Sequence, residues 1–227
     1  MDEDLDALIR RVDPDRWLSS RFIAAQAKRA DVLALYAFDH ELARAPRAST
    51  NPLIGEMRLA FWHEVLDEIF QGRPVRAHPA AQALAAAVRR HTLPRAPLQS
   101  MLDARDRELD RKPLTAEEAR ALGASTGGES AALAARVLEP HAPAGQVLAQ
   151  GARWALSRLL LAGRIAEPQA PAVRAQLLGQ GRAPPIPAAA FPAAAHAALA
   201  RPYAAGRRPS ELEKRLRITW AVARGRA

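Results

Sequence analysis

The chain of 227 residues contains no cysteine, few aromatic residues and no long apolar run. The absence of cysteine excludes disulfides and thiolate metal sites, which fits a reducing compartment. No stretch approaches the roughly 18 apolar residues that a membrane-spanning helix needs. The acidic opening, MDEDLDALIRRVDPDRW, lacks the basic and apolar regions of a secretory signal. We therefore expect a cytoplasmic protein, with peripheral contact at the inner face of a membrane as a further option.

Residues that favour β-strands are also scarce, whereas alanine, leucine, arginine and glutamate dominate. This mixture favours helices and supplies little material for sheets. With 49% hydrophobic residues, the chain is long enough for one sizeable core. We predict an all-α protein with one helical domain over residues 1–227.

Apolar periodicity, caps and prolines divide the chain into helices. They predict helices over residues 14–23, 28–44, 55–71, 79–91, 97–111, 115–138, 144–165 and 210–227. Apolar residues surround most of the helix at 28–44, which indicates a central, nearly enclosed position. A Gly127-Gly128 pair is a weak point in the helix at 115–138. Residues 168–209 contain eight of the 18 prolines, so we expect short, less regular elements there and the loosest part of the fold.

Positive charge is concentrated near the end of the chain. Residues 201–227 hold eight Arg or Lys against Glu211 and Glu213, an excess of +6 within the net +9. Such a segment suits an anionic membrane surface, nucleic acid or an acidic protein, although a solvated helix face is the simpler interpretation. No nucleic-acid-binding module accompanies the charge, so nucleic acid is not expected as a partner. A capping box at Ser210 predicts a basic C-terminal helix, in which one stripe contains Leu212, Leu216, Thr219 and Ala223.

Arg58 falls near the centre of the apolar arc of the helix at 55–71. A buried guanidinium is costly unless it is paired. Asp39, which stands among apolar residues of the preceding helix, is a suitable partner, as is Glu41. We predict an interior contact between Arg58 and one of these carboxylates. The alternative is that Arg58 lines a cavity as a phosphate ligand.

Few residues form patterns typical of catalysis or metal binding. Asp103, Asp106 and Asp110 have a spacing that could hold a hard cation, but a solvated acidic face paired with Arg107 and Arg111 is the simpler interpretation. The six histidines include no i, i+4 pair, and no serine or threonine has a base at a meaningful spacing. We therefore expect no metal site and no catalytic residue.

The segment YAFDHELARAPRA, at residues 36–48, resembles the first signature of the squalene/phytoene synthase family, which continues into an Asp-rich metal motif. Similar segments follow in the family's order, at Met57-Arg58, Phe61-Trp62-His63, Leu93-Pro94, Glu108-Leu109-Asp110 and residues 151–166. Together they span about residues 16–190. The resemblance implies an isoprenoid-synthase-like helical bundle around a central cavity, short in its C-terminal part.

The same resemblance implies an enzyme that condenses two prenyl diphosphates with Mg²⁺ held by two acidic clusters. Here the corresponding positions hold Ala43, Arg44 and Arg47 in the first cluster, and Arg158, Leu161, Ala162 and Ala166 in the second. Every expected metal carboxylate is missing. Guanidinium groups at these positions match diphosphate oxygens without a metal. The candidate residues of this vestigial pocket are Tyr36, Arg44, Arg47, Arg58, Trp62 and Arg158.

Glu41-Leu42-Ala43, in place of an acidic cluster, is similar to a non-enzymatic branch of the superfamily, the assembly factors for respiratory complex I and their bacterial relatives. Our first hypothesis is therefore a non-catalytic assembly or binding factor, with subunits of a membrane respiratory complex as partners. An active prenyltransferase with relocated ligands is the alternative, and only that alternative requires Mg²⁺. A third hypothesis is an isoprenoid or lipid carrier that binds the tail in the cavity and the head group on arginines.

Overall fold

The computed structural model describes residues 4–48, 51–181 and 183–226, and within them the chain is built of helices with one isolated bridge between Leu114 and Ile165. The all-α prediction is confirmed. The N-terminal half contains α1 (Leu5–Val12), α2 (Pro14–Ser20), α3 (Gln26–Arg44), η1 (Ala45–Arg47), α4 (Pro52–Phe70), α5 (Pro79–His91), α6 (Arg95–Asp103) and η2 (Asp106–Glu108). The remainder contains α7 (Ala116–Gly123), η3 (Ala124–Gly128), α8 (Glu129–Leu138), α9 (Ala144–Leu161), α10 (Ala170–Gly179), η4 (Phe191–Ala193), η5 (Ala195–Leu199), α11 (Ala200–Ala204) and α12 (Glu211–Arg224).

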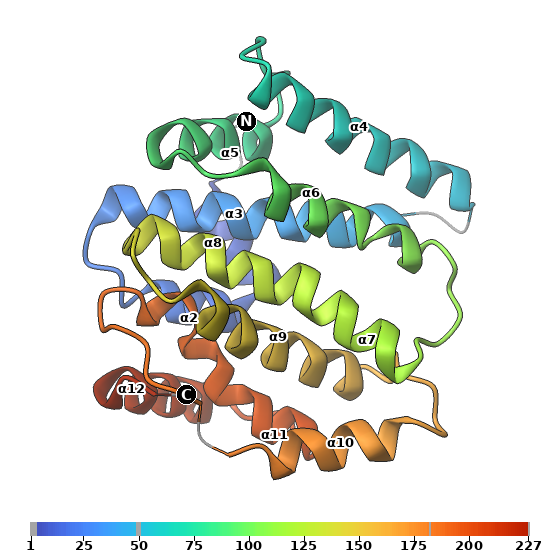
Figure 1. Cartoon of the computed structure of the whole chain (residues 1–227), viewed down its shortest axis with the longest axis vertical. Coiled ribbons are helices and arrows are strands. Elements are labelled where there is room, and N and C mark those ends of the chain that lie inside the picture. The colour runs from blue at the N-terminus through green and yellow to red at the C-terminus, as the bar shows by residue number, and fades with distance from the viewer. Residues whose placement is uncertain (1–3, 49–50, 182, 227) are drawn as a thin grey trace.

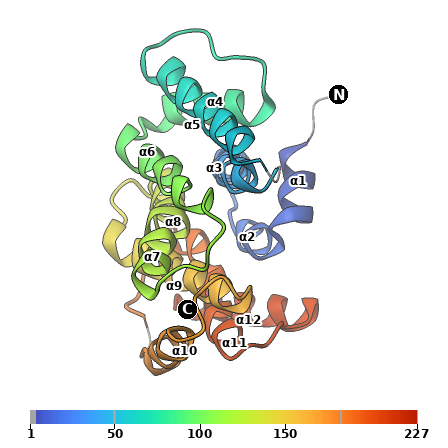
Figure 2. The ribbon, with the colours of Figure 1, turned by 90° about the vertical axis from the view of Figure 1, so that its right-hand side faces the viewer.

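The helices are stacked from α4 and α5 at one end of the molecule, through α3, α8 and α9, to α10–α12 at the other (Figures 1 and 2). The central position predicted for α3 agrees with its burial. Val32, Leu35, Tyr36, Phe38 and Leu42 are all at most 1% exposed although they point to different sides of the helix. The helix packs against α1, α5 and α8, which fixes its place at the centre of the fold.

The predicted helix at 115–138 is present as α7 and α8, which the π-helical turn η3 joins into one rod. The predicted capping box at Thr115 is present and starts α7. The two glycines of η3 allow α9 to cross closely: a Cβ atom added to Gly151 would lie 2.3 Å from the carbonyl oxygen of Gly127. This close crossing fixes α9, which carries the second signature, against the α7–α8 rod.

Several helix boundaries differ from the sequence prediction by a few residues, and two differences are larger. An additional helix, α1, precedes α2, with Asp4 as its N-cap. The helix expected at 97–111 ends at Asp103, because Arg105 and Glu108 turn inward and form ion pairs in the interior. Tertiary ion pairing has therefore overridden the helical preference of this segment.

The proline-rich segment forms short elements, α10, η4, η5 and α11, as its prolines predict. The expectation that it would be the loosest part of the fold is wrong for its second half. Phe191, Leu199 and Tyr203 are at most 5% exposed and belong to the main core. Alanine-rich composition explains this result, since small side chains allow the short helices to pack closely on α9.

The C-terminal helix α12 is present, with Ser210 as its N-cap. Its buried residues are Ile218 and Ala221, whereas Leu212, Leu216, Thr219 and Ala223 are exposed. The stripe identified in the sequence therefore points toward solvent. Among the described residues, every helix is too short or too polar to cross a bilayer.

Candidate functional site

A cavity of about 590 Å³ opens between α3, α4, α9 and the turn at η2. Seven arginines line it: Arg16, Arg44, Arg47, Arg58, Arg105, Arg158 and Arg164. The carboxylates in the lining are Asp13 and Asp39. Its apolar wall is formed by side chains that include Leu122, Trp154 and Leu159, and the guanidinium of Arg158 lies 4.8 Å from the Trp154 ring centroid. The cavity thus combines an apolar wall with an excess of positive charge.

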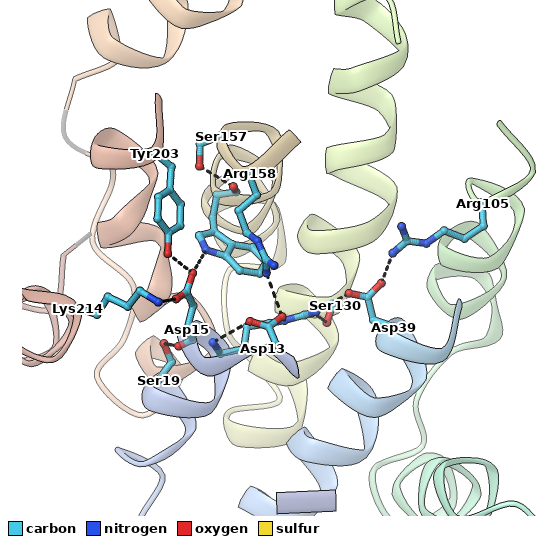
Figure 3. A network of polar contacts seen from close by, with 12 residues as sticks. Asp13, Asp15, Ser19, Asp39, Arg105, Ser130, Ser157, Arg158, Tyr203 and Lys214 are labelled. Carbon is cyan, nitrogen blue, oxygen red and sulfur yellow. Dashed lines mark hydrogen bonds and ion pairs between the residues drawn. The ribbon is translucent and has the colours of Figure 1, made fainter. Parts of the chain in front are cut away.

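Two of these arginines are enclosed in a buried ion network (Figure 3). Asp39 accepts hydrogen bonds from Arg16 Nη2 at 2.7 Å and from Arg105 Nη2 at 2.6 Å. Arg16 also donates from Nε to Asp13 Oδ2 at 2.6 Å and from Nη1 to Ser130 Oγ at 3.1 Å. All of these side chains are buried. The network ties α2, α3, α8 and the turn before η2 together beneath the cavity.

The buried carboxylates stay ionised because of these partners. Burial alone would raise the pKa of Asp13, but Arg16 and Arg158 outweigh it and hold this pKa at about 2. The same balance between burial and the charges of Arg16 and Arg105 lowers the pKa of Asp39. Neither carboxylate is therefore free to bind a metal unless an arginine leaves.

A third acid, Glu108, lies just outside the cavity and holds three of its arginines. Its carboxylate pairs with Arg105 Nη1 at 2.6 Å, Arg47 Nη2 at 2.8 Å and Arg164 Nη1 at 3.4 Å. The Glu108 side chain is only 1% exposed, whereas that of Arg47 is 55% exposed. Arg47 and Arg164, which line the cavity, are thus held in place by a buried acid.

A second buried group lies between α2, α9 and α12. Asp15 Oδ2 accepts hydrogen bonds from Tyr203 Oη at 2.6 Å and Trp154 Nε1 at 3.3 Å, and Oδ1 pairs with Lys214 Nζ at 3.3 Å (Figure 3). His196 stacks edge-on against Trp154, with 4.6 Å between ring centroids. Burial, and then the charge of Arg16, lowers the pKa of His196 to about 3, so this histidine is neutral in the folded protein.

Four of the six residues predicted for the pocket lie around the cavity: Arg44, Arg47, Arg58 and Arg158. Tyr36 lies beneath it, fully buried, with the Arg16 guanidinium 4.8 Å from its ring centroid. Burial raises the pKa of Tyr36. Trp62 lines a different, smaller cavity of about 210 Å³ with Phe61 and His78. These two aromatic residues therefore do not share the arginine cavity.

The predicted interior contact of Arg58 is wrong. Arg58 is exposed, and none of the described carboxylates pairs with it. The helix α4 is rotated so that Leu59 and Trp62 face the core, which leaves Arg58 at the cavity edge and Met57 65% exposed. The alternative, a cavity-lining position, agrees with the structure.

The sequence did not identify Asp13, Arg16 or Arg164 as site residues, and Glu108 was noted only as part of a segment similar to the family. Arg105 carried a signal, since a cation within an apolar stripe requires a buried partner. Asp39 carried the same signal, but its partners are Arg16, 23 residues earlier, and Arg105, 66 residues later. Separations of this kind cannot be read from a local pattern.

The positions of the two expected metal clusters meet across the cavity. Ala43, Arg44 and Arg47 lie on one side, and Arg158 and Ala162 lie on the other. Magnesium requires several oxygen ligands, and guanidinium and methyl groups supply none. The residues present at these positions therefore do not fit Mg²⁺.

The acidic residues considered as an alternative cation site do not form one. Asp103 accepts from Gln99 Nε2 at 2.7 Å, and Asp110 pairs with Lys112 at 3.2 Å. Arg107 pairs with the Glu118 carboxylate and donates to the backbone carbonyl oxygen of Asp110 at 3.0 Å, not to its carboxylate. In the part of the chain that the structure describes, no group of three or more histidine and acidic side chains is placed to hold a metal ion. That the protein needs no cofactor stays a prediction.

Comparison with known proteins identifies the family of the chain. A family model described as squalene/phytoene synthase matches residues 9–158, about two thirds of the chain. The chain belongs to the squalene/phytoene synthase family. Helices α2 to α8 and most of α9 fall within the matched region, and they carry most of the residues that line the cavity.

Curated relatives carry the name of an assembly factor. A protein of Bos taurus, NADH dehydrogenase (ubiquinone) complex I, assembly factor 6, is 36% identical over 105 residues. The Homo sapiens protein of the same name is 35% identical over 105 residues. Each alignment covers 46% of this chain and 31% of the relative. The similarity thus places the chain near named assembly factors over part of its length.

Proposed function

We propose that this chain is a non-catalytic assembly or binding factor that serves a membrane respiratory complex of the complex I type. The observation that carries the proposal is the replacement of both acidic clusters by alanine, leucine and arginine at positions that meet across one cavity. The printed name of the bovine and human relatives supports the same function. Subunits of that complex are the proposed partners, met from the cytoplasmic side of the membrane.

The main alternative, a prenyltransferase with relocated ligands, would need carboxylates that converge from two helices. Among the described residues, the carboxylates in the cavity lining are Asp13 and Asp39, and both are already bound by arginines at 2.6–2.7 Å. Releasing either acid for a metal would leave a buried guanidinium without its partner, which is costly. The geometry therefore favours a retained scaffold over a retained active site.

A pull-down of the full chain under native conditions tests the proposal. We expect this chain to recover subunits of the respiratory complex. An unrelated protein of similar charge that carries the same tag should not recover them. In parallel, the purified chain is incubated with farnesyl diphosphate and Mg²⁺ beside an active family member. Release of pyrophosphate by this chain would overturn the non-catalytic assignment.

A second candidate, an isoprenoid or lipid carrier, is favoured by the chemistry of the cavity. Its apolar wall suits a hydrocarbon tail, and its exposed arginines suit a phosphorylated head group. Native mass spectrometry of the purified chain tests this candidate, because a carrier retains its ligand. A spectrum that shows only the protein mass, before and after addition of farnesyl phosphate, would contradict it.

A further inference from the structure

The outward face of α12 presents a stripe of large apolar side chains. Leu212, Leu216 and Trp220 are 67%, 63% and 59% exposed. Their spacing of four residues places them above one another on one side of the helix. The opposite side packs into the protein through Ile218 and Ala221, which are at most 4% exposed. The stripe is therefore a fixed surface feature of a helix that is already docked.

Cations flank this stripe on both sides. Going around the helix at 100° per residue, Arg215 lies beyond Leu212, and Arg217 and Arg224 lie beyond Trp220. The Arg224 guanidinium is 4.2 Å from the Trp220 ring centroid. The acid nearest the stripe, Glu213, is neutralised by Arg217 at 2.8 Å and by Arg207 at 2.9 Å. The outward face thus carries a net positive charge around an apolar centre.

Contacts on the inner side set the orientation of the helix. Lys214 reaches inward to Asp15 at 3.3 Å, and Ile218 and Ala221 contribute to the main core. Rotation of α12 that would bury Leu216 would expose Ile218 and break the Asp15 contact. The fold therefore keeps the stripe turned outward.

We infer that α12 lies on an anionic lipid bilayer, with Leu212, Leu216 and Trp220 at the level of the head groups and the flanking arginines on lipid phosphates. A narrow apolar stripe between basic rows, with a tryptophan at its edge, is the pattern of an interfacial helix. This site is separate from the cavity and does not depend on the proposed function.

A second copy of the chain fits this face less well. Pairing two such stripes would bring basic rows against each other, and like charges across an interface are unfavourable. Three side chains also supply far less than the roughly 800 Å² per partner of a stable dimer. An anionic bilayer instead offers the complementary charge.

Sedimentation with lipid vesicles tests the inference. The full chain is mixed with vesicles of phosphatidylcholine alone and with vesicles that also contain phosphatidylglycerol. We expect binding to the anionic vesicles, weakened by salt because exposed charges are screened. Replacing Leu216 and Trp220 by serine should weaken that binding by about tenfold or more, since each buried large apolar side chain contributes substantially.

A matched control is available on α4, at the other end of the molecule (Figure 1). Leu53 and Met57 are 57% and 65% exposed, so replacing both by serine removes a similar apolar area. This control should bind vesicles like the wild type. A third variant, with Arg215 and Arg224 changed to glutamine, should lose the salt dependence in part and bind more weakly.

Three results would overturn the inference. They are equal binding to neutral and anionic vesicles, equal loss in the α4 control, and a dimer in sedimentation equilibrium that the Leu216 and Trp220 changes abolish. Helical circular dichroism and the thermal midpoint of each variant confirm that it is folded. Tryptophan fluorescence adds a direct readout, because Trp220 is the most exposed of the tryptophans and its emission should shift to the blue on anionic vesicles.

Discussion

The arginines around the cavity form two groups that differ in how they are neutralised. Arg16 and Arg105 are 5% and 6% exposed, and their partner carboxylates, Asp39 among them, are buried with them. Arg44 and Arg158 have side chains 54% and 43% exposed and hold looser contacts at the rim. The positive charges of the inner group are neutralised by buried carboxylates. The rim group has more positive charge than nearby carboxylates can neutralise.

This difference shows how the buried carboxylates are used in this chain. Asp39 lies one helical turn before Ala43, the first of the expected metal positions. Its carboxylate points to Arg16 and Arg105 instead of into open solvent. Asp39, the carboxylate one turn from the expected metal positions, therefore joins helices, and the positions at the rim hold Arg44 and Arg47 instead of acids.

Substitution of Asp39 by asparagine should remove the ion pairs that hold the inner group together. The change leaves Arg16 and Arg105 buried with one carboxylate fewer, and breaking a buried pair in this way costs about 3–5 kcal/mol. We expect the free energy of unfolding, measured with urea, to fall by that amount and the thermal midpoint to drop with it.

Glu41→Gln is the matched control for the Asp39 variant. Glu41 pairs with the exposed Arg44 at 2.9 Å on the same helix. Exposed pairs contribute about 0–1 kcal/mol, so this variant should remain close to the wild type. Equal stabilities of the two variants would remove the distinction between inner and rim charges.

The pH dependence of the free energy of unfolding should report on His196, whose pKa is lowered by burial and in part by Arg16 of the inner group. An unfolded histidine gains a proton below about pH 6.5, whereas buried His196 does so only near pH 3. The unfolded state therefore binds more protons between these values, and stability falls as the pH drops. Between pH 7 and pH 5 the His196 imidazole alone should lower the free energy of unfolding by about 2 kcal/mol.

His196→Phe should flatten that part of the stability profile, as measured by urea unfolding at each pH. The exposed His141, changed to glutamine, is the control and should leave the slope unchanged. A His196 variant with the wild-type slope would show that this histidine gains its proton over the same pH range in the folded and unfolded states.

The helical framework could be predicted because its signals are local. The capping box at Thr115 starts α7, the N-cap Ser210 starts α12, and apolar residues all around α3 indicate its enclosed position. The convergence of the two altered signatures also followed from the resemblance. By contrast, the partners of Asp39 come from elements far away in the sequence, and only tertiary packing brings them together.

Faces of helices were harder to predict than helices themselves. On α4 and α12 apolar residues lie on more than one side of the helix, and the sequence does not indicate which side is buried. Arg58 was assigned to the interior, yet Leu59 and Trp62 occupy the core side. On α12 the polar anchor from Lys214 to Asp15 selects Ile218 over Leu216. Single contacts between distant elements thus decide which stripe faces solvent.

Replacing Arg58 by alanine should affect the rim without affecting the fold. Arg58 is exposed and lies at the cavity edge, so the free energy of unfolding should change by less than about 0.5 kcal/mol. If the rim excess binds anions, affinity for pyrophosphate, measured by calorimetry without divalent metal, should fall by about tenfold or more, since a hydrogen bond to a charged group contributes about 1.5–3 kcal/mol. Arg136→Ala, on the outer side of α8, is the control and should retain affinity. Equal affinity of both variants would show that the rim arginines do not act as a binding group, although the inner network would still hold the fold.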